Sequence, residues 1–280
     1  MTQTVLVTGT SSGFGAAAAR HFSERGWNVI ATMRDPSKAG DLASLNNVEV
    51  LKLDAEDQST SETAIQQGIK RFGKIDVVVN NAGYGLFSVF EGASREAIQK
   101  QFATNVFGAM DVVRAILPHF RANKKGTIIN VSSGAGAIGF PMASIYSSSK
   151  FALEGWSEGL RYELGALGIT VKIIEPGGAM ATGFMARVGG EASSVQLIED
   201  YLPWLEQIGK LYVGVGEAAD PDAVDKVVAA IFAAATDGTD QLRYTPTNDI
   251  APILNARRST SEAEYQSFTT GLFVPQVQQA

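Results

Sequence analysis

The chain has 280 residues, of which 45% are hydrophobic and 19% are charged, a balance that suits a globular protein with a sizeable core. Its net charge of −6 argues against a nucleic-acid partner, and the lack of cysteine excludes disulfides, thiolate metal sites and cysteine nucleophiles. Only two histidines are present, too few for a histidine-based zinc centre, so no metal site is expected.

Targeting signals are not visible in the sequence. No apolar run approaches the ~18 residues of a membrane span. The N-terminal residues lack the basic and apolar pattern of a signal peptide, and a strand is expected within a few residues of Met1. We therefore expect a cytoplasmic protein with no membrane partner.

Short apolar runs alternate with longer helical patterns, which predicts a parallel sheet with crossover helices. The expected strands are apolar on both faces, as in strands covered by helices on each side: Thr4–Thr8, Asn28–Thr32, Glu49–Lys52, Asp76–Asn80, Gly126–Val131 and Thr170–Ile174. Helices are expected at Gly15–Arg25, Glu62–Phe72, Arg95–Phe120, Ala143–Leu167 and Pro221–Ala235. Without repeats or a clear linker, the simplest account is a single α/β domain over residues 1–280, a Rossmann-type doubly wound parallel sheet.

The first predicted strand runs into a glycine-rich turn between Thr8 and Gly15. Glycines permit a tight turn and close backbone approach, and the N–H groups that begin the next helix face the phosphates of a ligand. A strand before the turn and a helix after it are the context that this motif requires. The pattern predicts a dinucleotide phosphate site at Gly9, Ser11, Ser12, Gly13, Phe14 and Gly15.

Tyr146 and Lys150 lie one helical turn apart, on one face of a predicted helix. A phenol loses its proton near pH ~10, so it is a poor acid–base catalyst at neutral pH. A positive charge ~4 Å away at an effective dielectric of ~20 contributes ~4 kcal/mol, which corresponds to two or three pKa units at ~1.4 kcal/mol each. We expect Lys150 to lower the pKa of Tyr146. A tuned proton donor beside a nucleotide site indicates hydride transfer to and from a carbonyl.

Together these motifs resemble the short-chain dehydrogenase/reductase family. The spacing Gly-x-x-x-Gly-x-Gly after Thr8, the run Asn80-Asn81-Ala82-Gly83, the pair Tyr146-x-x-x-Lys150 and the dipeptide Pro176-Gly177 occur in the family's order. Ser133 stands thirteen residues before the tyrosine, and Asn105 matches the family's remaining catalytic position. The resemblance covers roughly residues 4 to 180 and is much weaker beyond about residue 185.

The resemblance implies a carbonyl reductase or secondary-alcohol dehydrogenase whose catalytic residues are Asn105, Ser133, Tyr146 and Lys150. Tyr146 would protonate the carbonyl oxygen as hydride arrives, and Ser133 would hold that oxygen in line. Lys150 would also hydrogen-bond the nicotinamide ribose, and Asn105 would anchor a water that links the lysine to solvent, unless it merely caps its helix. Further cofactor contacts are implied for Asn81, Ala82, Gly83, Pro176 and Gly177. Relatives commonly pair through their two long helices, which implies a homodimer or homotetramer.

The choice of nicotinamide depends on the end of the second strand, Met33-Arg34-Asp35. NAD-selective folds place an acidic side chain there for the ribose hydroxyls, and we place Met33 at that position. Arg34 follows, where a guanidinium receives a 2′-phosphate, which favours NADP (NADPH). Asp35 either pairs with Arg34 or serves as the NAD-type acid, and Ser12 supplies no second positive charge, so NAD is not excluded.

Asp54 follows the third strand and resembles the family's adenine-contacting acid. Its alternative is a helix cap. Both readings rest on its position after the strand.

Residues 178–216 are where the family builds its substrate lid, and here they are rich in methionine and apolar or aromatic side chains: Met180, Phe184, Met185, Tyr201, Leu202, Trp204, Leu205, Ile208, Leu211 and Tyr212. The stretches Tyr84–Phe87 and Ala137–Met142 are expected to border the same cavity. These side chains either bind a bulky hydrophobic ketone or secondary alcohol, or pack the lid onto the domain. The family's usual threonine after the proline is replaced by Ala181, and Thr182 follows it.

The C-terminal extension, residues 238–280, contains a helix-like stretch at Ser261–Phe268. It covers the site, supports an oligomer, or does both. A catalytically silent nicotinamide sensor, or an epimerase or dehydratase, would use the same fold. A sensor needs no proton donor, so the full catalytic set favours the enzyme.

Overall fold

Seven parallel strands form one sheet in the order β3-β2-β1-β4-β5-β6-β7. The structure is a computed structural model that describes residues 2–177, 195–217 and 220–274. The strands are β1 Thr4–Thr8, β2 Asn28–Met33, β3 Val48–Lys52, β4 Val77–Asn80, β5 Gly126–Val131, β6 Ile169–Ile174 and β7 Arg243–Tyr244. The first six confirm the predicted strands to within a residue, whereas the two-residue β7 was not predicted.

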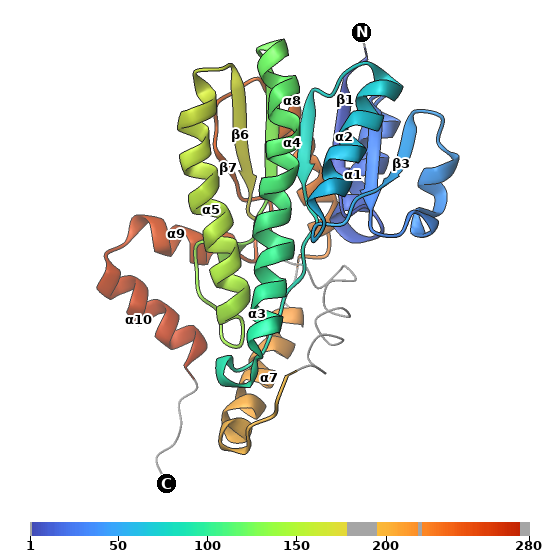
Figure 1. The fold of residues 1–280 in the computed structure, drawn as a ribbon. Coiled ribbons are helices and arrows are strands. Elements are labelled where there is room, and N and C mark those ends of the chain that lie inside the picture. The colour runs from blue at the N-terminus through green and yellow to red at the C-terminus, as the bar shows by residue number, and fades with distance from the viewer. Residues whose placement is uncertain (1, 178–194, 218–219, 275–280) are drawn as a thin grey trace.

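Helices cover both faces of the sheet (Figure 1). On one face lie α1 Gly13–Glu24 and α8 Ala223–Thr236, and on the other lie α2 Gln58–Phe72, α4 Gly108–Asn123 and α5 Ser144–Gly165. The expected helix Arg95–Phe120 is α3 Arg95–Phe102 and α4 joined by a π-helical turn, Ala103–Phe107. Towards the carboxyl ends of the strands lie α7 Leu202–Glu217, α9 Ala251–Ser259 and α10 Glu262–Phe273 (Figure 1).

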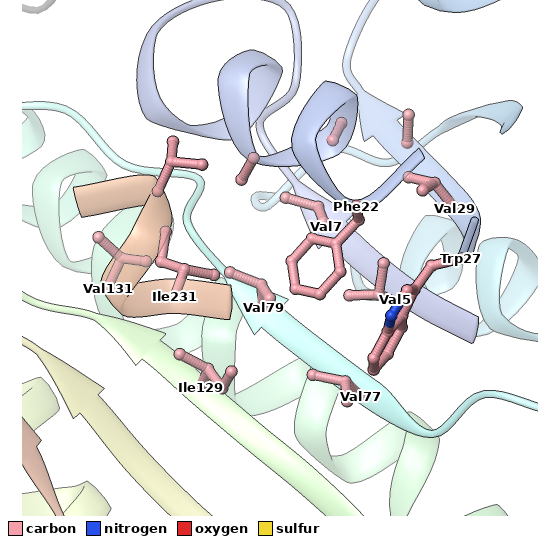
Figure 2. Close-up of a cluster of buried hydrophobic side chains, with 14 of the residues drawn as sticks. Val5, Val7, Phe22, Trp27, Val29, Val77, Val79, Ile129, Val131 and Ile231 are labelled. Carbon is pink, nitrogen blue, oxygen red and sulfur yellow. The ribbon is translucent and has the colours of Figure 1, made fainter. Parts of the chain in front are cut away.

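The core has two layers because successive strand residues point to opposite faces of the sheet. Val5 and Val7 face α1 and α8, where Phe22 and Trp27 pack over the strands (Figure 2). Leu6, between the two valines, faces α2 and α4 instead. Both faces are therefore dry, which explains why the strands are apolar throughout and why the sheet is a rigid support for its carboxyl edge.

The buried Lys172 of β6 joins that strand to the end of α8 and to β7 in the C-terminal extension. Lys172, 2% exposed, pairs with Asp237 and donates to the Tyr244 hydroxyl at 3.0 Å. Burial raises the pKa of Asp237, but hydrogen bonds from Lys172 and Tyr244 lower it by more, so that the pKa of Asp237 is about 2.

Glu175, directly after β6, is fully buried. It accepts from Thr245 at 3.1 Å, lies 3.4 Å from Arg243 and pairs with Arg258 of α9. The extension thus supplies both countercharges of a carboxylate at the carboxyl edge of the sheet.

No helix in the described ranges is long and apolar enough to cross a membrane.

Candidate active site

A cavity of about 610 Å³ lies at the carboxyl edge of the sheet, where the strand order reverses between β1 and β4. Such switch points are where open α/β sheets bind their ligands. Two predicted site residues, Gly15 and Asn105, do not line the cavity. All the others do: Gly9, Ser11, Ser12, Gly13, Phe14, Arg34, Asp54, Asn81, Ala82, Gly83, Ser133, Tyr146, Lys150, Pro176 and Gly177.

The glycine turn is locked to the end of β4. The Thr8 hydroxyl accepts hydrogen bonds from the backbone N–H groups of Asn81 and Ala82 at 3.0 and 2.9 Å, and Asn81 Nδ2 donates to the Thr8 carbonyl at 2.9 Å. Gly9 has a φ of +72°, which favours glycine. A Cβ on Gly15 would lie 2.4 Å from both the Gly9 carbonyl oxygen and Asn81 Nδ2. Gly15 therefore packs beneath the turn and allows it to approach a ligand.

This cradle fits the phosphates of a dinucleotide. Ser12 is the N-cap of α1, and its side chain makes no capping hydrogen bond. The cavity continues from the turn past Gly83 to Tyr146 and Lys150 without leaving the sheet edge. The backbone N–H groups that begin α1 thus lie at one end of a cavity that has a phenol and an ammonium at the other.

Ser133, Tyr146 and Lys150 form one cluster between β5 and α5. The Ser133 hydroxyl lies near the Tyr146 phenol and favours its ionised form. Lys150 Nζ donates to the Val131 carbonyl at 2.9 Å and lies 5.9 Å from the centre of the Tyr146 ring. The side chains of Tyr146 and Lys150 are buried, so α5 holds both in fixed positions at the end of β5.

The expected lowering of the Tyr146 pKa is wrong for this structure. Burial raises the pKa of Tyr146 to about 12, and the nearby Ser133 hydroxyl only partly opposes that rise. Burial also lowers the pKa of Lys150 to about 8, against the attraction of the Glu154 carboxylate one turn further along α5. Removal of water is the largest cause of both shifts, and burial is a property that helical spacing does not reveal.

Asn105 lies in the π-helical turn and does not cap a helix, because α3 and α4 continue on either side. Its Oδ1 accepts from the Tyr84 backbone N–H at 3.0 Å. Its Nδ2 donates to the Tyr84 carbonyl at 2.9 Å and to the Ser149 hydroxyl at 3.1 Å. The side-chain amide therefore ties the segment after β4 to α5, and both its donors are occupied.

The residues after β2 carry two cations at the cavity. Arg34 lines the cavity beside Met33, and so does Lys38, which the sequence analysis missed. The Asp35 carboxylate accepts from the Ser37 backbone and hydroxyl at 3.1 and 2.7 Å and caps the short turn Pro36–Lys38. Those hydrogen bonds lower the pKa of Asp35. Of its two expected roles, the pair with Arg34 is not formed among the described residues, and Asp35 itself lines the cavity.

Asp54 lines the cavity after β3. Its Oδ1 accepts from the Glu56 backbone N–H at 3.1 Å. The N-cap of α2 is Asp57, which accepts from the Ser59 N–H at 3.1 Å, so the alternative of a helix cap for Asp54 is wrong.

Aromatic and apolar side chains surround the end of the cavity that contains Tyr146. Phe87 stacks near Tyr146 with ring centres 5.7 Å apart, and Tyr212 of α7 contacts Phe87 at 6.0 Å. The Tyr212 hydroxyl donates to the Pro141 carbonyl at 2.7 Å, which fixes α7 over the site. Leu211 and Tyr212 are the expected lid residues that line the cavity. Met180, Ala181, Thr182, Phe184 and Met185 lie outside the described residues.

The C-terminal extension also forms part of the cavity wall. Asp249, Ile250, Ile253 and Phe273 line it, and Phe273 contacts Phe140 with ring centres 5.4 Å apart. Sequence analysis missed these four residues because no local motif marks them. The extension therefore covers the site, one of the two roles that the sequence left open.

A glycine turn at the switch point of a parallel sheet, with Ser133 and the buried Tyr146 and Lys150 in the same cavity, is typical of a dinucleotide-dependent oxidoreductase. The family model for short chain dehydrogenases matches residues 3–191. The chain belongs to the short-chain dehydrogenase/reductase family, whose members use a nicotinamide cofactor to interconvert alcohols and carbonyls.

Similar proteins support this assignment. An uncharacterized oxidoreductase of Schizosaccharomyces pombe is 41% identical over 81% of this chain and 93% of its own length. Retinol dehydrogenase 8 of Bos taurus is 34% identical over 87% of this chain and 83% of its own.

Solved structures agree with the fold and the cofactor class. A crystal structure of a short-chain dehydrogenase from Streptomyces avermitilis has a TM-score of 0.82 at 30% identity and covers 96% of this chain and 97% of that one. ElxO with NADP bound has a TM-score of 0.69 at 26% identity, over 88% of this chain and 98% of that one.

Proposed function

We propose that the protein transfers hydride between NADP(H) and a bulky hydrophobic ketone or secondary alcohol, with Tyr146 as acid and base. The observation that carries this proposal is the placement of Ser133 and Tyr146 together in the cavity that the glycine turn also lines. A carbonyl oxygen bound between them would lie within reach of both hydroxyls. The bound nicotinamide supplies the hydride.

In the reductive direction Tyr146 acts as a neutral phenol, because burial raises its pKa to about 12. It donates its proton to the carbonyl oxygen, and Ser133 donates a second hydrogen bond to the negative charge that develops there. The Lys150 ammonium, 5.9 Å from the ring centre, stabilises the phenolate that remains. In oxidation the phenolate accepts the proton of the alcohol. Lys150 also binds the nicotinamide ribose, and Asn105 acts as a positioning residue.

NADP is the proposed cofactor because two cations line the ribose end of the cavity and one oxygen of the neighbouring Asp35 carboxylate is already engaged. Arg34 and Lys38 line this end, whereas Asp35 is engaged by Ser37. A guanidinium and an ammonium attract a 2′-phosphate. Equal affinity of Arg34→Ala and wild type for NADPH, with unchanged preference over NADH, would contradict this assignment.

A bulky apolar substrate is proposed from the walls around Tyr146. Phe87, Phe140, Leu211 and Tyr212 enclose the phenol, and Ile253 and Phe273 add apolar surface from the extension. Such walls favour apolar ligands and offer few donors to a small polar one. The similarity to retinol dehydrogenase 8, whose name gives a large apolar alcohol as substrate, supports the same class. The lid is proposed at 178–216, within one catalytic domain of residues 1–280.

A homodimer or homotetramer is proposed through the outer faces of the long helices. Large apolar side chains are exposed there: Phe107 at 56%, Phe151 at 44% and Tyr162 at 79%. Exposed apolar groups on neighbouring helices suit burial against a second copy. Phe151→Glu should lower the oligomeric state in light scattering, and an unchanged mass would contradict this interface.

The test adds purified protein to NADPH and, separately, to NADH with carbonyls graded by size and polarity, and follows the loss of reduced-cofactor absorbance. We expect turnover with NADPH and bulky apolar ketones. Tyr146→Phe should remove at least ~99% of that rate, the scale of lost acid catalysis, while it binds NADPH nearly as tightly as wild type. Tight binding of NADPH by wild type without turnover of any ketone would favour a sensor.

A further inference from the structure

The carboxylate of Asp249 lies at the cavity wall without a partner. Asp249 stands in the C-terminal extension, between β7 and α9, and lines the cavity. Its Oδ1 atom is buried and makes no hydrogen bond, and no ion pair joins Asp249 to another of the described residues. Buried hydrogen-bond acceptors in proteins are nearly always paired, so an unpaired one indicates that a bound ligand supplies the donor.

The backbone after β7 aims this carboxylate at Gly177. Alternate residues contact the segment after β6: Thr245 donates to Glu175 at 3.1 Å, and Thr247 accepts from the Gly177 N–H at 2.8 Å. Asp249 follows Thr245 and Thr247 at the same two-residue spacing, so its side chain faces the same segment. A Cβ on Gly177 would lie 2.5 and 2.7 Å from the two Asp249 carboxylate oxygens. The carboxylate is therefore in contact with the glycine that the cofactor is proposed to touch.

Among the residues that the structure describes, no group supplies the missing donor. The nearby Gly177 N–H is already donated to Thr247. Lys226 feels the charges of Asp222 and Asp249, but its ammonium gives hydrogen bonds of 2.8 and 2.6 Å to the two oxygens of Asp220, and these are the main cause of its raised pKa. The adjoining wall residues Ile250 and Ile253 have no polar side-chain atoms.

We propose that Asp249 accepts a hydrogen bond from an N–H or O–H group of the ligand that lies against Gly177. This inference rests on the proposed function, because it takes the ligand to be the nicotinamide or the substrate beside it. Two sources carry this chemistry: the carboxamide N–H of the nicotinamide, and a hydroxyl on the substrate close to its carbonyl. In either case a residue of the extension sets specificity in a cavity that is otherwise lined mainly by apolar groups at this end.

The experiment compares wild type with Asp249→Ala, which removes the acceptor, and Asp249→Asn, which keeps a neutral one. Asp240→Ala is the matched control, because Asp240 is a 95% exposed carboxylate of the same extension. One arm measures the dissociation constants of NADPH and of its 3-acetylpyridine analogue, which has no carboxamide N–H, by fluorescence titration without substrate. The other arm measures kcat/KM for a long-chain 2-ketone and its 1-hydroxy derivative.

A loss of ~10-fold or more is expected in one arm, since hydrogen bonds to charged groups are strong. If Asp249→Ala weakens NADPH but not the analogue, the carboxamide is the donor. If NADPH binding is unchanged and the preference for the hydroxy ketone disappears, the substrate is the donor. Asp249→Asn should lose less affinity or efficiency than Asp249→Ala in the affected arm, because its amide oxygen still accepts a hydrogen bond. This partial rescue keeps the test valid if the alanine variant does not fold.

Unchanged values in both arms, with wild-type turnover intact, would overturn the role of Asp249 and leave the proposed function standing. Failure of the wild type to bind NADPH and to reduce any ketone would remove the proposed function and the inference with it.

Discussion

Lys150 is a buried ammonium whose charge destabilises the folded protein. Its side chain is 6% exposed, and burial lowers its pKa from 10.5 to about 8. A difference of about 2.5 units at ~1.4 kcal/mol each corresponds to about 3 kcal/mol. Lys150→Met removes this cost but leaves the Val131 carbonyl without its 2.9 Å hydrogen bond, a loss of ~1–3 kcal/mol. The variant should therefore equal or exceed wild type in stability at pH 7, although it loses its activity.

The pH dependence gives the sharper result. Below pH 8 both the folded and the unfolded wild type carry the lysine proton, so the cost is fully present. Between pH 8 and 10.5 the folded form has lost that proton while the unfolded form keeps it, so wild-type stability rises with pH relative to Lys150→Met. Above 10.5 the cost is gone.

The assay is urea unfolding of both proteins without cofactor at pH 7, 8, 9 and 10. The difference in free energy of unfolding between the variant and wild type should shift by about 3 kcal/mol in favour of wild type across this range. A difference that stays constant with pH would refute the reasoning, because it would mean that Lys150 has an ordinary pKa in the folded protein.

Three other perturbations test the surroundings of the site. Gly15→Ala should destabilise by ~1–3 kcal/mol in thermal unfolding and weaken NADPH binding, because its Cβ would meet backbone at 2.4 Å; Gly155→Ala, with open space around it in α5, should stabilise slightly. Asp237→Asn should cost ~3 kcal/mol or more in urea at pH 7, because Lys172 is left buried and unpaired; a loss under ~1 kcal/mol would contradict this. Glu154→Gln should lower the pKa of Lys150, because the Glu154 carboxylate raises it. The rise of stability with pH should then begin at a lower pH in urea unfolding, and an unchanged pH dependence would show that the two groups are uncoupled.

Local patterns were sufficient to predict most of the fold, and together with the family resemblance they pointed to side chains that line one cavity. The six long strands are runs of apolar residues whose partners are set by the crossover helices, and the turn, Ser133, Tyr146 and Lys150 lie at fixed spacings along the chain. β7 was missed because two residues carry no periodicity, and its place depends on the buried Lys172 and Glu175 of a distant segment.

Properties that arise only from tertiary contacts were not predicted. The pKa of Tyr146 is set by burial under Phe87 and its neighbours, which the Tyr-Lys spacing does not contain. Asp35 accepts from a serine two residues away, a partner that was not among the two roles expected for it. Asp249 reaches the cavity only because the segment after β7 runs beside the segment after β6.

The buried carboxylate of Glu175 has a consequence for the order of synthesis. The polypeptide emerges from the ribosome with Glu175 immediately behind β6, but Arg243 and Arg258 are translated much later. Until both arginines have been added, closure of the sheet edge would enclose an uncompensated negative charge, which is strongly unfavourable. The nascent chain therefore forms this edge of the sheet only after both arginines have been added. A product truncated before Arg243 would have an unstable carboxyl edge. The same acid that anchors the cavity wall thus makes this edge of the sheet depend on an extension that reaches Arg258.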